Sequence, residues 1–114
     1  MLIPKTSNNQ LQTNRLLTPT QSAGLESFTY PNSKVISSNS NVLVLESSDS
    51  ANAVTNWYKQ QIRTEGMNTT SFVTTNTNGN VLNKLVGSNS YKKIDVEIRQ
   101  ESNQSAVKMI IYVN

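Results

Sequence analysis

The stretch from Ser50 to Glu65 carries the full set of signals for one amphipathic helix, and it constrains the fold more than any other part of the chain. Either Asp49 or Ser50 can accept hydrogen bonds from the free N–H groups of a first helical turn. Gly66 can take the left-handed conformation that ends a helix, with an apolar contact from Met67 closing the last turn. Apolar residues spaced three and four apart form one stripe, which is expected to pack on other elements. The stripe consists of Val54, Trp57, Tyr58 and Ile62.

The segments on both sides of this helix have the patterns of β-strands. Before it, the apolar run Val42 to Leu45 suits a strand that is central or buried on both faces. After it, the pair Asn78-Gly79 predicts a two-residue hairpin, because both residues tolerate positive φ. The last two segments alternate apolar and polar residues, which is typical of strands with one buried face. The expected strands are residues 34–37, 41–46, 70–75, 81–86, 92–100 and 106–113, of which 81–86 also fits a short helix.

This order, β-β-α-β-β-β-β, predicts an α+β fold with one helix packed on an antiparallel sheet of about five to six strands. Short turns join most of the segments, so successive strands should pair antiparallel. A helix of about 16 residues is ~24 Å long, which matches strands of ~20–27 Å and lets it lie along one face. The 114 residues fit one domain. We assign the domain to 28–114 and a flexible polar linker or stalk to 1–27.

The residue types that the chain lacks exclude several classes of function. Cysteine and histidine are both absent, so disulfides, thiolate or histidine zinc sites, and Ser-His or Cys-His nucleophile pairs are impossible. The net charge is +3, but the ten basic residues are scattered, whereas proteins that bind nucleic acid usually cluster theirs on one face. No segment approaches the ~20 apolar residues of a membrane span. We therefore expect no cofactor, no nucleic-acid partner and no membrane span in this chain.

Three patterns look like catalytic or metal sites, and each has a plainer explanation. Ser90–Lys93 matches the S-x-x-K pattern of some serine acyl-enzymes, but that motif needs the start of a helix and here leads into a strand. Asn76–Gly79 looks like part of a calcium loop, but the acidic residues at its first and last positions are missing. Asp95 and Glu97 share a strand face on which basic side chains flank them, so a ladder of solvated charges is expected. We predict that the chain is not an enzyme.

The last strand has one feature that these exclusions leave unexplained. Ile110 and Tyr112 point away from the apolar face of that strand, so they lie on the open face of the sheet if the helix covers the other one. Antiparallel sheets usually keep such a face polar. Two explanations stay open: Leu25, Phe28 or Tyr30 folds across the pair, or the pair contacts a partner or a second copy. The predicted contact face consists of Lys93, Glu97, Lys108, Ile110 and Tyr112.

Several of these residues also form a recurring pattern. They are Tyr30-Pro31 before a strand, Glu46–Ser50, Val54 with Trp57-Tyr58, and Gly66-Met67. The pattern resembles that of many uncharacterised bacterial extracytoplasmic domains, although Asn32-Ser33 stands here where those have Gly-Ala. The resemblance covers residues 30–113 or so. It implies this fold and a place outside the membrane, anchored by an N-terminal helix or a lipid and a polar stalk, and it brings no catalytic residues.

Two functions fit these observations. The first is a non-enzymatic extracytoplasmic domain, held off a bacterial membrane, which binds a protein or a cell-envelope component as a monomer or weak homodimer. It predicts a membrane helix or a lipid-attachment cysteine encoded upstream of Met1. The alternative is a structural or assembly subunit, such as a minor pilin or a phage particle protein, with Ile110 and Tyr112 as its assembly contact.

Overall fold

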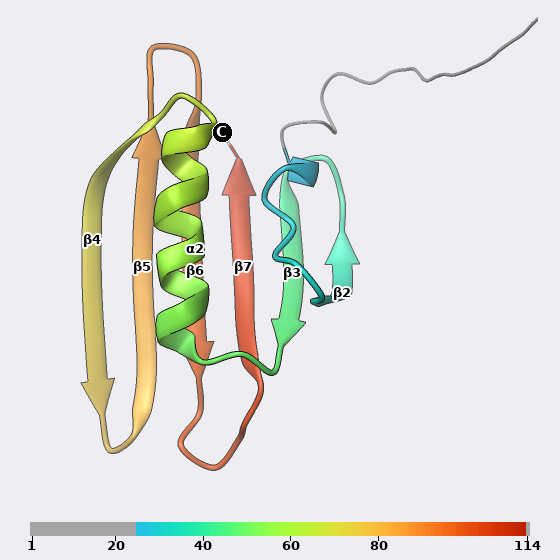
Figure 1. The fold of residues 1–114 in the computed structure, drawn as a ribbon, viewed down its shortest axis with the longest axis vertical. Helices are drawn as coiled ribbons and strands as arrows, with labels where there is room; N and C mark the ends of the chain where they lie inside the picture. The colour runs from blue at the N-terminus through green and yellow to red at the C-terminus, as the bar shows by residue number, and fades with distance from the viewer. Residues whose placement is uncertain (1–24, 114) are drawn as a thin grey trace, which may run out of the picture.

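The computed structural model describes residues 25–113, and it confirms the predicted α+β fold: a helix packs on a six-stranded antiparallel sheet (Figure 1). Residues 81–86, for which strand and helix both stayed open, belong to a strand. No helix among the described residues is long and apolar enough to cross a membrane. The elements are β2 (Lys34–Ser38), β3 (Val42–Ser47), α2 (Ala51–Thr64), β4 (Asn68–Thr77), β5 (Asn80–Ser88), β6 (Lys93–Gln100) and β7 (Val107–Val113).

The strand order in the sheet is β2-β3-β7-β6-β5-β4. The four strands from β4 to β7 form a meander, as expected for strands joined by short turns. However, β3 pairs with β7, so that Leu43 lies opposite Ile111 and Leu45 opposite Met109. The sequence did not predict this pairing. It follows from α2, which carries the chain across the sheet from β3 to the far edge (Figure 1).

Both ends of α2 follow the predicted capping chemistry. Ser50 is the N-cap, and its Oγ accepts a hydrogen bond of 3.1 Å from the backbone N–H of Ala53. At the other end Gly66 has φ 79° and donates to the carbonyl of Arg63, while Met67 donates to that of Ile62. These two bonds, both 3.0 Å long, form a Schellman motif. The helix is therefore fixed by local sequence at both ends.

The hairpin between β4 and β5 also forms where it was predicted. Asn78 and Gly79 both have positive φ, 54° and 82°, which is the conformation of a type I′ turn. The turn places Thr77 opposite Asn80 and so fixes the register of the longest strand pair in the sheet.

The hydrophobic core lies between the sheet and two covering segments. A helix is about 10 Å wide and therefore covers about two strands spaced ~4.8 Å apart. Helix α2 runs along the strands in front of β5 and β6, and the segment from residue 25 to 33 lies in front of β3 (Figure 1). The buried apolar residues of the strands are Leu43, Leu45, Leu85, Ile94, Val96, Ile98, Val107, Met109 and Ile111. Of the two alternatives for residues 42–45, the central strand is confirmed, because β3 lies between β2 and β7, whereas burial on both faces is wrong, because only Leu43 and Leu45 are fully buried.

The segment from residue 25 to 33 extends the helix layer. Leu25, Phe28 and Tyr30 are buried in the core beside α2. The Tyr58 hydroxyl donates to the Phe28 carbonyl, and the Gln61 side chain donates to the Ser27 carbonyl, both at 2.8 Å. The explanation that Leu25, Phe28 or Tyr30 crosses the open face is therefore wrong, because these residues pack on the helix side. Of the predicted linker 1–27, residues 1–24 lie outside the described part of the chain, whereas Leu25 belongs to the core.

The apolar stripe of α2 is slightly rotated from its predicted position. Tyr58 and Ile62 are fully buried, but Trp57 is only half-buried and packs edge-on against Tyr30 and Tyr58 at ring distances of 5.4 and 4.8 Å. Ala51 and Thr55 are also buried, and the predicted apolar stripe includes neither of them. The aromatic side chains of the helix are thus packing groups, as the sequence indicated.

Candidate functional site

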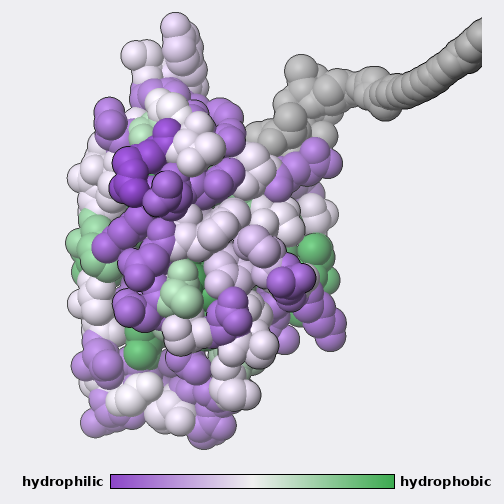
Figure 2. Space-filling model, viewed as in Figure 1, coloured by the Kyte–Doolittle hydropathy of each residue, from purple (hydrophilic) through white to green (hydrophobic). Residues whose placement is uncertain are grey.

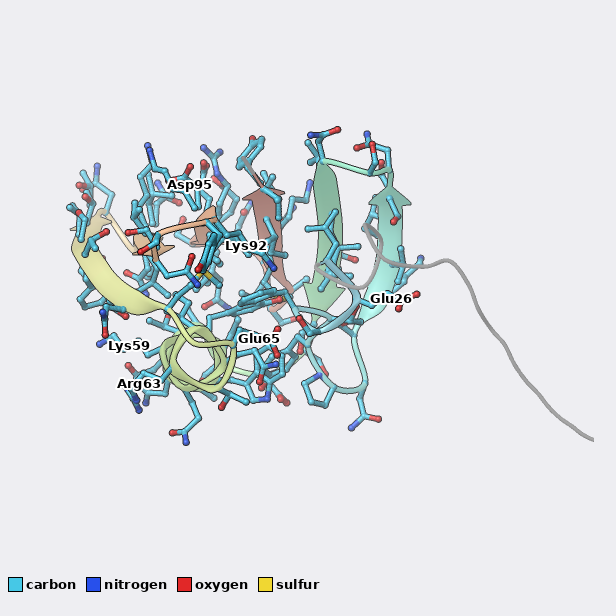
Figure 3. The ribbon with its side chains drawn as sticks, turned by 90° about the horizontal axis from the view of Figure 1, so that it is seen from above. Glu26, Lys59, Arg63, Glu65, Lys92 and Asp95 are labelled. Atoms are coloured by element: carbon cyan, nitrogen blue, oxygen red, sulfur yellow. The ribbon has the colours of Figure 1, made fainter. Side chains whose placement is uncertain are left out.

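The face of the sheet opposite α2, called the open face from here on, carries all five predicted contact residues. Lys93 and Glu97 lie on β6, and Lys108, Ile110 and Tyr112 lie on β7. Their alternation with buried neighbours sets their side chains away from the helix. Seen along the strands, Asp95 of the same face points away from α2, whereas Lys59, a residue of α2, lies on the helix side of the sheet (Figure 3).

The strand register brings four of these five residues together. Glu97 is directly opposite Ile110, and Lys108 and Tyr112 are the neighbours of Ile110 on the same face of β7. Lys93 is the exception, because it is paired with Ser88 at the end of β6 and lies beyond the row of Tyr112. The sequence thus placed the correct residues on one face, and only the register shows which of them touch.

Two residues of β3 complete an apolar cluster that the sequence reading missed. Val42 is opposite Tyr112, and Val44 is opposite Ile110. Side chains two apart on adjacent strands form a square of roughly 5 by 7 Å. Val42, Val44 and Ile110 are half-buried and Tyr112 is 40% exposed. We call these four residues the apolar centre; the uninterrupted apolar run in β3 was the signal that could have located it.

Charged side chains of both signs surround the apolar centre. On the β6 side, Asp95 and Glu97 face Tyr112 and Ile110 across the strand pair. Beyond Ile110, the next row runs Arg99–Lys108–Glu46, and so puts two cations side by side. The only ion pair among the described residues joins Arg99 to Glu97 at 2.7 Å, and the Arg99 side chain is 48% exposed. The face therefore has an apolar middle and a mixed, solvated rim.

The open face is shallow. Two depressions flank the apolar centre, with volumes of about 270 and 370 Å³. The first lies over β5 and β6 beside Tyr112, between Lys84 and Asp95. The second lies beside Ile110 and Lys108 at the turn between β6 and β7. Both depressions are open to solvent, whereas pockets for small molecules are usually deeper and largely apolar. This shape suits contact with a large surface.

The residues of the weak catalytic patterns do not assemble a reaction centre in the structure. Ser90 and Lys92 lie in the turn between β5 and β6, and the pattern ends at Lys93, the first residue of β6. Glu97 is engaged by Arg99, as the charge-ladder interpretation expected. Within residues 25–113, no group of three or more acidic side chains is placed to hold a metal ion.

The clearest pKa shifts belong to tyrosines of the helix layer, away from the open face. Burial and a hydrogen bond of 2.6 Å to Asp49 raise the pKa of Tyr30 to about 12. Burial also raises the pKa of Tyr58 far above its ordinary value. Both hydroxyls hold core elements together through fixed partners, so these shifts have a structural origin.

In addition to the two depressions of the open face, a hollow with a volume of about 340 Å³ lies on the helix side, between α2 and β4. Phe72 lines it, and the Lys59 ammonium lies 3.9 Å from the centre of the Phe72 ring in a cation–π contact. At its base, buried Asn83 donates to Thr55 at 2.8 Å, and the Asn83 Oδ1 has no partner among the described residues. That oxygen is enclosed by protein, so a molecule in the hollow does not reach it.

A scan against models of known protein families finds no match to the chain, and a search of curated proteins finds no significant similarity.

Proposed function

We propose that this chain is a non-enzymatic binding module of the bacterial cell exterior, and that it holds a protein partner on the open face of its sheet. The observation that carries the proposal is the apolar centre, which no described element covers. An apolar middle with a polar rim is the arrangement of protein–protein interfaces. An antiparallel sheet that had only to face water would carry polar residues at Val44 and Ile110 as well.

The dimensions of the face support a protein as the occupant. Six strands spaced ~4.8 Å apart and about 20 Å long offer roughly 600 Å². A standard interface buries about 800 Å² on each partner, so the face fits one partner of modest affinity. The rim specifies the charges of that partner: an acidic group opposite Arg99 and Lys108, and a basic group opposite Asp95.

A crosslinking experiment tests this proposal. The photoreactive residue p-benzoylphenylalanine replaces Tyr112 in the full-length protein, expressed in its own host. The matched control carries it at Tyr91, which is 95% exposed but lies in the β5–β6 turn. We expect a discrete adduct with one other protein from position 112, none from position 91, and loss of the adduct when Lys108→Glu is added.

The other outcomes of the crosslinking contradict the proposal. No adduct at position 112, or equal adducts at both positions, removes the open face as the binding surface. An adduct of the chain with itself would instead assign the face to assembly, which is the function of a structural subunit.

A stability measurement separates a contact surface from a packing feature. If Ile110 and Tyr112 serve a partner, the Ile110→Ser/Tyr112→Ser variant should lose less than about 1.5 kcal/mol of unfolding free energy, because neither side chain is fully buried. Urea denaturation of the isolated protein measures this loss. A much larger loss with an unchanged oligomeric state would show that the pair only stabilises the fold.

The location is a separate part of the proposal, supported by the resemblance of residues 30–113 to anchored extracytoplasmic domains. It predicts that the coding sequence upstream of Met1 encodes a membrane helix or a lipid-attachment cysteine. A reading frame that truly starts at Met1 would contradict it.

A further inference from the structure

The two edges of the sheet are unequal. The β2 edge is five residues long, has an irregular register between Val35 and Ser37, and begins with Lys34. The β4 edge is ten residues long, and all of its residues are exposed. Proteins protect edge strands by making them short, bulged or charged, because the free N–H and C=O groups otherwise pair with another chain. By these criteria β2 is protected and β4 is open.

The sequence of β4 also favours the addition of another strand at this edge of the sheet. Its register with β5 is irregular only between Thr69 and Ser71, so the seven residues Ser71–Thr77 form a regular edge. These residues, SFVTTNT, contain no charged residue, no proline and no glycine, and five of them are β-branched or aromatic. Segments of six or seven residues with this composition are the ones that add strands to one another.

Both faces of β4 carry exposed apolar side chains. Phe72 is on the helix side, opposite Leu85, and is 42% exposed; Val73 is on the open face and is 53% exposed. Phe72 stays exposed because α2 covers β5 and β6 and leaves the hollow of about 340 Å³ beside β4. Figure 2 shows apolar surface at the lateral margin over β4 and also at the opposite margin over β2, where Val35 and Ile36 are exposed. A strand added to β4 would cover Phe72 and Val73.

We propose that β4 pairs with β4 of a second copy, antiparallel and around a two-fold axis normal to the sheet. Such an axis keeps each residue on its own face, so paired positions must be an even number of residues apart. Centring the axis on Thr74 pairs the whole stretch Ser71–Thr77 with itself and sets Val73 opposite Thr75 of the other copy. Because the stretch is uncharged, like charges do not oppose each other across the new pair.

Self-pairing also explains why a second copy is the expected occupant. An antiparallel β4–β4 contact is isologous, so it uses both open edges and leaves only the two protected β2 edges. The product is a closed dimer with one sheet of twelve strands and both helices on the same side. This contact uses a different surface from the open face and does not depend on the partner proposed above.

Sedimentation velocity of the full chain, from about 1 µM to 1 mM, tests the inference with two matched variants. Val73→Lys puts a charge on the β4 edge, and Val35→Lys puts the same charge on the β2 edge at nearly the same exposure, 53% against 52%. We expect a monomer–dimer equilibrium whose dissociation constant rises at least about tenfold in Val73→Lys and stays within about twofold in Val35→Lys. Ile110→Ser should leave the dimer intact.

Single cysteines give a second measurement that does not depend on how well Val73→Lys folds. These 114 residues contain no cysteine, so in this protein Thr74→Cys has only its own copy as a partner, and directly paired strands bring Cα atoms within disulfide range. Oxidation should link Thr74→Cys into dimers and leave Val35→Cys monomeric. A protein that stays monomeric to 1 mM, equal crosslinking of both variants, or a ladder of larger oligomers would overturn the inference.

Discussion

Ile62 of α2 packs directly on Gly87 of β5. A Cβ atom added to Gly87 would lie 2.6 Å from Cγ2 of Ile62 and 3.0 Å from its Cγ1. Carbon atoms in contact are ordinarily about 3.5–4.0 Å apart, so no other residue fits at position 87 without a shift. Because Ile62 is fully buried, this glycine sets how closely the last turns of the helix approach the sheet.

The first prediction concerns this contact. Gly87→Ala should lower the free energy of unfolding by about 2–3 kcal/mol, because the new methyl group overpacks the core. Ile62→Ala alone should cost about 3 kcal/mol through the cavity that it leaves. In the double variant the methyl group added at position 87 occupies part of that cavity. The stability loss of the double variant should therefore be smaller than the sum of the two single losses by at least about 1 kcal/mol. Additive losses in a double-mutant cycle by urea denaturation would contradict the contact.

A second prediction concerns the buried polar pair under the hollow beside β4. Thr55→Val should cost about 1–2 kcal/mol, because it leaves the Asn83 amide with no partner at all. Adding Asn83→Leu should recover that loss and raise stability to the natural value or slightly above it, since both polar groups are then gone. Thermal unfolding of the two variants measures the difference. If the double variant is the less stable of the two, the amide has a partner that the contacts do not show.

A third prediction follows from the shifted tyrosine pKa values. In the unfolded chain, both tyrosines lose their phenol protons near the ordinary tyrosine pKa of 10. In the folded protein, Tyr30 has a pKa of about 12 and the pKa of Tyr58 is also raised, so both keep their protons above pH 10. Stability from these groups is therefore complete below pH 10 and is lost as the pH rises from 10 through 12. Urea denaturation at a series of pH values should show this decline.

Two phenylalanine variants isolate the contribution of Tyr58. Tyr58→Phe should be less stable at pH 7 by about 1–3 kcal/mol, because the buried Phe28 carbonyl loses its donor. Above pH 10 its stability should fall less steeply than that of the natural protein. Tyr91→Phe, at a position that is 95% exposed, should keep the stability of the natural protein at pH 7. An equal slope above pH 10 in Tyr58→Phe and the natural protein would exclude Tyr58 as a cause of the decline.

The fourth prediction concerns the ion pair on the open face. Arg99→Gln should change the free energy of unfolding by less than about 1 kcal/mol, because the Arg99 side chain is half exposed and water screens the pair. Even this small effect should shrink in 0.5 M salt, which urea denaturation at two salt concentrations can measure. A large loss of unfolding free energy that does not change with salt would contradict this prediction, because it would show that Arg99 stabilises the fold by more than its charge interaction with Glu97.

The sequence predicted those parts of the fold that short-range chemistry determines. The caps of α2 and the Asn78-Gly79 turn depend on neighbouring backbone groups, so their residue types sufficed to place them. Alternation likewise showed which side chains of β6 and β7 face away from the core. These signals gave the fold class and the residues of the predicted contact face.

Contacts between distant segments left no such signal. The pairing of β3 with β7 depends on the connection through α2, which takes the chain from β3 to the far edge of the sheet. Neither strand has a local sequence pattern that predicts which strand lies beside it. Val42 and Val44 were therefore not joined to Ile110 and Tyr112, although all four lie in one cluster. For the same reason the sequence places Leu25 in the linker, since its burial depends on residues far along the chain.

The pairing of β3 with β7 also governs when the protein can fold during its synthesis. β7 lies between β3 and β6, yet it is the last of these strands to leave the ribosome. Until residues 107–113 emerge, the early hairpin of β2 and β3 has no strand to join it to the rest of the sheet. The central contacts then form between residues that are 60 to 70 positions apart in the chain, which slows folding relative to a plain meander. A nascent chain of this protein should remain open to chaperones until β7 is free of the ribosome.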